Sequence, residues 1–181
     1  PHAGDVSAFV ATNVISITDR QIFLETNLFN AGILPAVNPG ISVSRVGGAA
    51  QTKAMKKAAG SIRIDLAQYR EMEVFTQFSS DLDAATKEQL EYGSGLMELL
   101  KQPLGHPMSM HEMVITLCAA RNKVLLGIPV KEVKKFQMDM LNYFATVHPE
   151  ISEEIEQTKA LSDELAAKIV ETAKEFKDSR C

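Results

Sequence analysis

The stretch PAVNPGISVSRVGGAAQ (residues 35–51) marks the main boundary in this chain, because it separates a β-like segment from a long helical region. The stretch holds two prolines, three glycines and a single arginine, Arg45. The neighbouring glycines allow a close approach of the backbone, and a guanidinium on such a corner is suited to binding an anion, above all a phosphate. On these grounds alone, an ordinary salt bridge to an acid elsewhere in the fold is the simpler interpretation of Arg45.

The residues before this stretch predict the end of an α/β unit. Two apolar, β-branched runs, 13–18 and 21–25, are separated only by Asp19 and Arg20, which predicts a tight β-hairpin. Residues 26–32 predict a helical turn that ends at Gly32, and residues 41–44 a last short strand. Because so few strands cannot cover both faces of a sheet, and because the chain lacks an initial methionine, we expect a longer polypeptide that begins upstream.

From about residue 51 onward the pattern is helical. Apolar residues recur at steps of three and four over 62–72, 110–121 and 161–176, and Ser109 is a predicted N-cap. Prolines or capping residues stand at the breaks between these segments. The predicted fold is therefore mainly α, with an α/β remnant (short β-hairpin and strand) at residues 1–51 followed by an all-α helical bundle at residues 52–181.

Composition excludes several classes of function. A formal net charge of −4 argues against non-specific binding to nucleic acid, and no apolar run approaches the roughly 20 residues that cross a bilayer. The two cysteines form no disulfide framework, and we expect Cys118 to be buried and inert. His106 and His111 have no carboxylate or cysteine at ligand spacing, so we predict no metal site.

Several segments resemble one family. PAVNPGISVS (residues 35–44) matches the signature of the α and β subunits of rotary ATPases: proline, a small residue, an aliphatic residue, Asn or Asp, three variable positions, then serine, any residue and serine. The arginine within SVSRVGGAAQTK is a mark of the α subunit. The segments GDVSAFVATNVISITDRQIFLETNLFNAGILPAVNPG, LAQYRE and QFSSDLDAAT also resemble that subunit, and the similarity weakens after about Gln102. The chain thus resembles the C-terminal third of an F-type ATP synthase α subunit.

The resemblance implies domains and site residues. Residues 1–51 would be the C-terminal end of a RecA-like nucleotide-binding domain, and residues 52–181 the C-terminal helical domain. Arg45 would be the arginine finger that reaches the terminal phosphate of nucleotide in the neighbouring β subunit. Ser16, Arg20 and Ser44 would lie at that interface. A guanidinium at the transferring phosphoryl group stabilises charge that develops in the transition state.

The resemblance also implies cofactors, partners and location. The complete complex would bind ATP or ADP with Mg²⁺ and make ATP from ADP and phosphate at the expense of a proton or sodium gradient. Its partners would be β subunits in an alternating hexamer and the γ stalk, with residues 78–86 as a stalk-facing loop. No nucleic acid and no membrane insertion are expected. The complex would be peripheral to an energy-coupling membrane, on the cytoplasmic, matrix or stromal side, with the bacterial plasma membrane preferred.

This segment alone is expected to bind no cofactor and to catalyse nothing. GGAAQTKA (residues 47–54) has the lysine of a phosphate-binding loop but lacks its second glycine and the Ser or Thr that binds magnesium. Three further positions depart from the family. Arg20 stands in the turn where glycine is usual, Leu34 replaces an arginine, and Leu104 replaces the second of two adenine-pocket glutamines, while Gln102 matches the first. We therefore expect a weakened nucleotide site on the α subunit itself.

Two other interpretations stay open. The chain could be a helical adaptor that retains the sequence and binds partners without nucleotide chemistry. A related ring ATPase, such as a flagellar export ATPase or the Rho helicase, fits less well because SVSRVGGAAQTK favours the α subunit. A phosphate-binding loop in frame upstream of Pro1 would separate the subunit from the adaptor.

Overall fold

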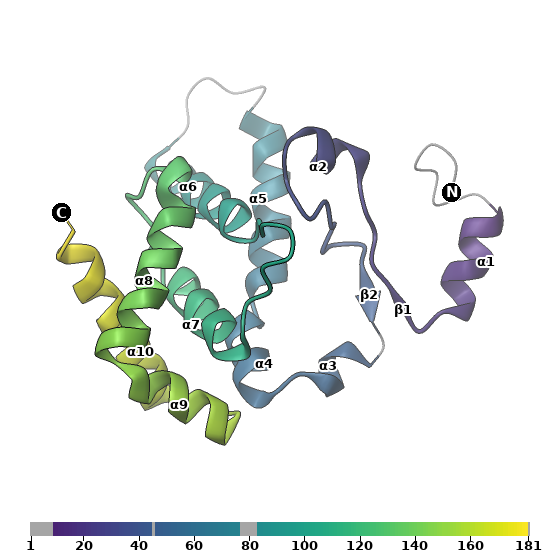
Figure 1. Ribbon diagram of the computed structural model, residues 1–181. Coiled ribbons are helices and arrows are strands. Elements are labelled where there is room, and N and C mark those ends of the chain that lie inside the picture. The colour runs from purple at the N-terminus through teal and green to yellow at the C-terminus, as the bar shows by residue number, and fades with distance from the viewer. Residues whose placement is uncertain (1–8, 45, 77–82, 181) are drawn as a thin grey trace. The chain divides into compact units, whose positions relative to one another are not determined.

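The computed structural model describes residues 9–44, 46–76 and 83–180 (Figure 1). The chain divides into two compact units. The first comprises Pro1–Gln51 with Lys101–Gly105, and the second Thr52–Leu100 with His106–Cys181. The described elements are α1 (Phe9–Ile17), β1 (Arg20–Gln21), α2 (Thr26–Asn30), β2 (Val43–Ser44), α3 (Gly47–Ala50), α4 (Lys53–Ala59), α5 (Ile62–Thr76), α6 (Ala84–Leu99), α7 (Met110–Arg121), the 3₁₀ turn η2 (Val130–Glu132), α8 (Val133–Val147), α9 (Pro149–Thr158) and α10 (Asp163–Asp178).

The prediction of a mainly α fold with a small β piece is confirmed. In the described part of the chain the only sheet has two strands, β1 and β2, which pair antiparallel with Arg20 opposite Ser44 and Gln21 opposite Val43. A single bridge between Leu24 and Val37 continues the pairing. The helix α2 and the left-handed Gly32 (φ 72°) agree with the predicted helical turn.

The predicted hairpin is wrong. Most of the run expected as a strand, residues 13–18, belongs to helix α1, and β1 pairs with β2 instead of with this run. Ser16 Oγ donates to the Asn13 carbonyl (2.8 Å), and Thr18 Oγ1 to the Val14 carbonyl (3.0 Å), as hydroxyls do on helices. A short apolar run does not distinguish helix from strand by periodicity. Among the residues that the structure describes, no strand pairs with this run, and a helix satisfies its own backbone groups.

The second unit has an apolar core. Helices α4 to α10 all contribute buried side chains, and those of α8 to α10 recur at steps of three and four, as the helical pattern requires. The fully buried side chains with the largest volumes are Phe144, Leu96, Ile115, Met140, Ile151, Ile155, Ile169, Val114 and Val133. The helices predicted over 62–72, 110–121 and 161–176 are confirmed as α5, α7 and α10.

Local signals place the ends of these helices. Ser109 caps α7 as predicted: its hydroxyl accepts from the Glu112 amide, and the Glu112 carboxylate accepts from the Ser109 amide, which is a capping box. The Glu112 carboxylate accepts hydrogen bonds from the Ser109 amide (2.7 Å) and the Ser109 hydroxyl (2.8 Å), and these lower its pKa. Asp83 and Ser162 are N-caps whose side-chain oxygens accept from the Thr86 and Leu165 amides of α6 and α10, and Pro149 stands in the first turn of α9.

Helices α5 and α6 pack closely, as their neighbouring ribbons in Figure 1 indicate. The contact depends on Gly93, because a Cβ atom added there would lie 2.2 Å from the ring of Tyr69. Gly95, two residues further along the same helix, has room: its Cβ would meet Leu125 at 4.0 Å. A glycine in the middle of a helix costs helix propensity, and at Gly93 that cost permits the close approach.

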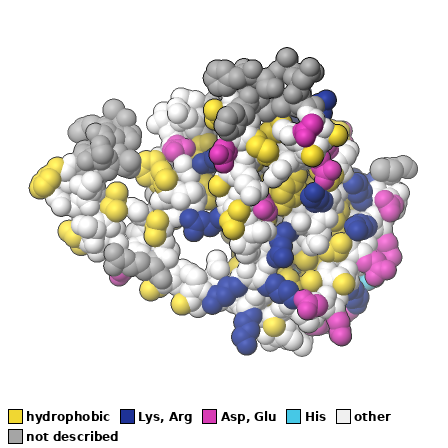
Figure 2. All heavy atoms as spheres, turned by 180° about the vertical axis from the view of Figure 1, so that it is seen from behind, with side chains coloured by type: hydrophobic (Ala, Val, Ile, Leu, Met, Phe, Trp, Pro, Cys, Tyr) yellow, Lys and Arg dark blue, Asp and Glu magenta, His cyan; other side chains and the backbone are white. Residues whose placement is uncertain are grey.

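The two units also differ at their surfaces. Of the large apolar side chains that are exposed in the described part of the chain, two thirds belong to the first unit. On the face in Figure 2, yellow apolar side chains lie among uncharged surface over the N-terminal elements, whereas blue and magenta charges gather over the helical part. No helix in the described ranges is both long enough and apolar enough to cross a lipid bilayer.

Candidate functional site

Asn38 organises the signature stretch of the first unit. It is buried, its side-chain amide donates to Glu25 (2.7 Å), and its side-chain oxygen accepts from the Gly40 amide (2.8 Å). Its backbone amide donates to the Phe23 carbonyl (2.8 Å), and its carbonyl accepts from the Ser42 hydroxyl. Ser42 Oγ in turn accepts from the Phe23 amide (3.0 Å). One asparagine therefore holds residues 35–42 against residues 23–25.

The corner around Arg45 is held on both sides. Arg45 itself lies outside the described residues. Before it, Ser44 pairs with Arg20 in the two-strand ladder. After it, the Gly47 amide donates to Ser44 Oγ (2.8 Å), and a Cβ at Gly47 would lie 2.7 Å from that oxygen. Glycine is thus required at position 47 for the turn to close on Ser44.

The structure brings two of the three predicted interface residues together. Arg20 and Ser44 are opposite each other in the ladder, and both are exposed. Ser16 is exposed on α1, where its hydroxyl is engaged by the Asn13 carbonyl. Because α1 replaces the expected strand, no ladder joins Ser16 to this corner in the described chain.

Residues 101–105 return to the first unit at the second predicted site. The Gln102 amide donates to the Leu34 carbonyl (2.9 Å), so the two regions that the family resemblance assigns to one nucleotide pocket are adjacent through their backbones. The side chains of Leu34 and Leu104 are 47% and 100% exposed. Two apolar side chains therefore face solvent at the positions where the family has polar groups.

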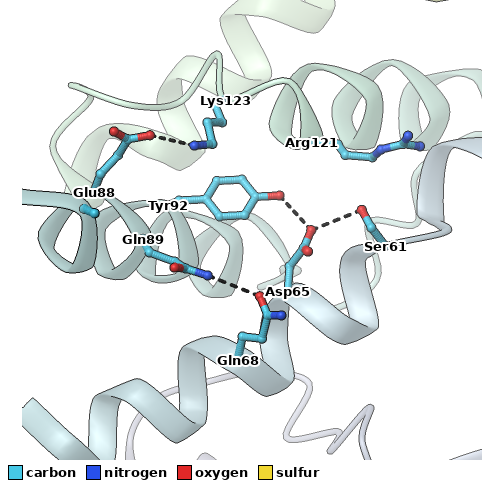
Figure 3. A pocket seen from close by; sticks show the side chains of 9 residues that line it. Ser61, Asp65, Gln68, Glu88, Gln89, Tyr92, Arg121 and Lys123 are labelled. Carbon is cyan, nitrogen blue, oxygen red and sulfur yellow. Dashed lines mark hydrogen bonds and ion pairs between the residues drawn. The ribbon is translucent and has the colours of Figure 1, made fainter.

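The helical unit contains a separate polar pocket (Figure 3). It is an open hollow of about 590 Å³ between α5, α6 and the end of α7. Its lining residues are Ser61, Asp65, Gln68, Ala85, Glu88, Gln89, Tyr92, Arg121 and Lys123. Hydrogen bonds and one ion pair connect most of these side chains across the pocket, as the dashed lines in Figure 3 mark.

Tyr92 is the residue at the centre of this network. Its hydroxyl donates to Asp65 Oδ2 (2.9 Å), which also accepts from Ser61 Oγ (3.2 Å). Burial raises the pKa of Tyr92 well above its usual range; the hydrogen bond and negative charge of Asp65 raise it further, and Arg121 opposes them. The phenol is therefore a permanent donor, and both Asp65 and Arg121 lie within electrostatic reach of it.

His106 and His111 do not come together at a metal centre. His111 Nδ1 contacts Glu156 Oε1 at 2.9 Å, whereas His106 is exposed. Within the described ranges, no three His, Cys, Asp or Glu side chains converge where a metal ion could bind. Cys118 is buried, as predicted, and burial raises the pKa of its thiol, which disfavours the reactive thiolate.

Comparison with known protein families assigns this chain to a class. Residues 51–176 match the family described as ATP synthase alpha/beta chain, C terminal domain. Residues 1–44 match the nucleotide-binding domain of the ATP synthase alpha/beta family. The chain therefore belongs to the ATP synthase alpha/beta family.

Individual relatives narrow the similarity to one subunit. The ATP synthase subunit alpha of Mycobacterium tuberculosis (strain ATCC 25618 / H37Rv) is 53% identical over 175 residues, which are 97% of this chain and 32% of the relative. The same protein of Mycobacterium bovis (strain BCG / Pasteur 1173P2) gives the same values. The chain spans about a third of the length of these curated relatives.

Some residues of these sites had no visible signal in the sequence. Asn38 belonged to the recognised signature, but its role as the centre of a hydrogen-bond cluster depends on partners 13 residues away. Asp65 and Tyr92 are separated by 27 residues and come together only because α5 and α6 are neighbours. The predicted stalk-facing loop, residues 78–86, lies mostly outside the described residues; its last residues begin α6.

Proposed function

We propose that this chain acts as part of a non-catalytic α subunit of an F-type ATP synthase, and that Arg45 is supplied to the catalytic site of an adjacent β subunit. Residues 1–51 then form the end of the RecA-like nucleotide-binding domain, and residues 52–181 the C-terminal helical domain. The complete complex couples ATP synthesis from ADP and phosphate to proton or sodium transport, with Mg²⁺ bound to the nucleotide. The helical domain faces the γ stalk, and the complex is peripheral to its membrane.

The observation that carries this proposal is the corner that flanks Arg45. Ser44 is fixed by the ladder with Arg20, and Gly47 is fixed by its hydrogen bond to Ser44. These two contacts give the residues on either side of Arg45 a defined geometry, and a catalytic group needs a defined geometry in order to act on a bound substrate. A guanidinium so placed stabilises charge on a transferring phosphoryl group, and in this proposal the phosphate belongs to another chain.

The exposed apolar side chains of the first unit support the same proposal. Ile17, Ile22 and Phe29 are exposed in the first unit. Extended apolar exposure of this kind is typical of surfaces that other protein segments cover. A helical adaptor without nucleotide chemistry would use such a surface too. The adaptor interpretation, however, does not explain the hydrogen bonds of Ser44 and Gly47 on either side of Arg45.

Replacement of Arg45 in the assembled complex tests the proposal. Arg45→Ala should permit assembly but lower steady-state ATP turnover by about 10³–10⁵-fold, the loss typical of a missing arginine finger. Arg45→Lys should recover little, because an ammonium cannot reproduce the two parallel hydrogen bonds of a guanidinium. Assembly is checked by gel filtration, and turnover by phosphate release. An alanine variant that assembles and turns over within a few-fold of the parent would exclude the arginine-finger role.

The second proposed property is a weakened nucleotide site on the α subunit itself. Leu34 and Leu104 replace two polar groups, one charged, which together are worth about 2–4.5 kcal/mol of binding. That corresponds to about 30- to 2000-fold in affinity. After removal of bound nucleotide, the assembled complex should refill its catalytic sites with ATP while the α sites exchange readily. The double variant Leu34→Arg, Leu104→Gln should restore slow exchange, whereas tight ATP retention by the parent would contradict the expectation.

A further inference from the structure

The pocket of the helical unit has the size of a small-molecule site and a mostly polar lining. Its volume of about 590 Å³ lies within the range of roughly 300–1000 Å³ that is usual for such sites. Charged and amide side chains of α5, α6 and the end of α7 line it (Figure 3). The proposed role of Arg45 makes no use of these groups.

One wall of the pocket offers an incompletely satisfied carboxylate. Asp65 Oδ2 accepts from Tyr92 and Ser61, and both donors are neutral hydroxyls. Among the residues that the structure describes, no lysine or arginine nitrogen lies within ion-pair distance of Asp65, and its Oδ1 accepts no hydrogen bond. An ionised carboxylate accepts up to about four hydrogen bonds, so Asp65 has capacity left for a positively charged donor.

The lining also contains two cationic side chains, Arg121 and Lys123. Arg121 Nη1 donates to the Lys57 carbonyl (2.5 Å), which uses one of the five donors of the guanidinium. Lys123 Nζ pairs with Glu88 Oε1 at 2.6 Å, but both side chains are about half exposed, and such surface pairs open readily. A carboxylate that enters the pocket therefore finds donors that are not committed to buried partners.

The charges of the lining balance: Asp65 and Glu88 are acidic, and Arg121 and Lys123 are basic. A ligand of either net charge would be repelled by one pair as much as it is attracted by the other. A ligand that carries both charges meets an opposite partner at each end. We propose that this pocket binds a small zwitterion of the α-amino acid type, with its ammonium group at Asp65 and its carboxylate at Arg121.

The amide pair in the pocket suggests the first probe. Gln89 Nε2 donates to Gln68 Oε1 (3.2 Å), which leaves one amide donor and one amide acceptor of the pair for a ligand. L-Glutamine carries a zwitterionic head and a side-chain amide that could pair with them. L-Glutaminamide lacks the carboxylate, and N-acetyl-L-glutamine lacks the ammonium, so the three compounds separate the two charges.

The experiment is an NMR titration of the whole 181-residue chain, labelled with ¹⁵N, with each of the three compounds. L-Glutamine should shift the backbone amides of Asp65, Gln89 and Tyr92 saturably at millimolar concentration. The cationic and the anionic analogue should each bind at least about tenfold more weakly. Equal binding of either analogue, or the absence of saturable shifts with L-glutamine, would overturn the proposal.

Two variants test which pocket residue binds the ammonium group of the ligand and which binds its carboxylate. Asp65→Asn should weaken L-glutamine and L-glutaminamide by about tenfold or more and leave N-acetyl-L-glutamine unchanged. Arg121→Gln should weaken L-glutamine and the anionic analogue and leave the cationic one unchanged. Glu153→Gln on the exposed face of α9 changes the net charge by the same amount as Asp65→Asn and should change nothing.

The decisive result is that each variant weakens a different analogue: Asp65→Asn the cationic one and Arg121→Gln the anionic one. Loss of all three ligands in one variant with an altered amide spectrum would indicate misfolding, and the other variant together with the three compounds would then decide. If Arg121→Gln fails to fold because its bond to the Lys57 carbonyl is lost, Lys123→Gln takes its place and should weaken only the ligands that carry a carboxylate. Unchanged binding of L-glutamine to folded Asp65→Asn would show that the ligand does not bind as proposed.

Discussion

Each of the two units of this chain is stabilised internally by a different kind of interaction. The helical unit buries a continuous apolar cluster that runs from Ala54 to Phe176. In the described part of the first unit only Ala36 and Asn38 are buried. Hydrogen bonds around Asn38 connect its chain segments. The first unit therefore has a defined local geometry without the apolar burial that ordinarily stabilises a domain.

This difference indicates that the helical unit supplies most of the stability, whereas the first unit is suited to contact another surface. A core of interlocked helices is self-sufficient, since each helix covers the apolar face of another. The hydrogen bonds of a corner with exposed apolar neighbours become stronger when another surface covers them, because hydrogen bonds are stronger away from water. The residues that flank Arg45 form a corner of this second kind, which fits the role proposed for Arg45.

The largest expected difference between the units concerns two phenylalanines. Phe144 is 1% exposed in the helical core, and Phe29 is 62% exposed on α2. Phe144→Ala should lower the free energy of unfolding by about 3–5 kcal/mol, because it leaves a cavity, whereas Phe29→Ala should change it by about 0.5 kcal/mol or less. Both values are obtained from urea unfolding followed by circular dichroism.

Amide hydrogen exchange on the same protein provides the control. Exchange should be slow over residues 62–75 and 110–125 and fast over residues 13–25. Equal protection of the two regions, or equal destabilisation by the two alanine variants, would show that the first unit shares the stability of the helical core.

The second prediction concerns the close contact within the helical unit. Gly93→Ala forces a methyl group onto Tyr69 and should destabilise the unit by about 1–3 kcal/mol through overpacking. Gly95→Ala, where the space is open, should be neutral or stabilising by up to about 1 kcal/mol, because alanine favours the helix. Thermal unfolding of the two variants measures both effects. If Gly93→Ala melted at or above the temperature of Gly95→Ala, the close contact between α5 and α6 would be in error.

The smallest effect is expected in the first unit. Asn38→Ala removes the hydrogen bonds to Glu25 and Gly40 and should lower the local opening free energy of residues 23–42 by about 1–2 kcal/mol. Amide exchange at Phe23, which donates to Ser42, reports this opening. Asn30→Ala, at an exposed position on α2, is the matched control and should leave exchange at Phe23 unchanged. An equal response to both variants would remove Asn38 from the centre of this cluster.

The sequence predicted the helical unit well because its signals are local. Ser109 followed by Glu112 predicts a helix start, and the spacing of apolar residues predicts which face is buried. The run at residues 13–18 was misassigned because its apolar, β-branched residues fit a strand or a helix equally well, and the choice depends on whether a neighbouring strand exists. Long-range contacts such as Tyr92 with Asp65 could not be predicted, since nothing in either segment specifies the other.

The return of residues 101–105 to the first unit has a consequence for cutting the chain into fragments. The chain passes from one unit to the other three times along its sequence, at residues 51–52, 100–101 and 105–106. A single cut at residues 51–52 would therefore leave residues 101–105 on the helical fragment. In that fragment the Gln102 amide would lose its acceptor, the Leu34 carbonyl.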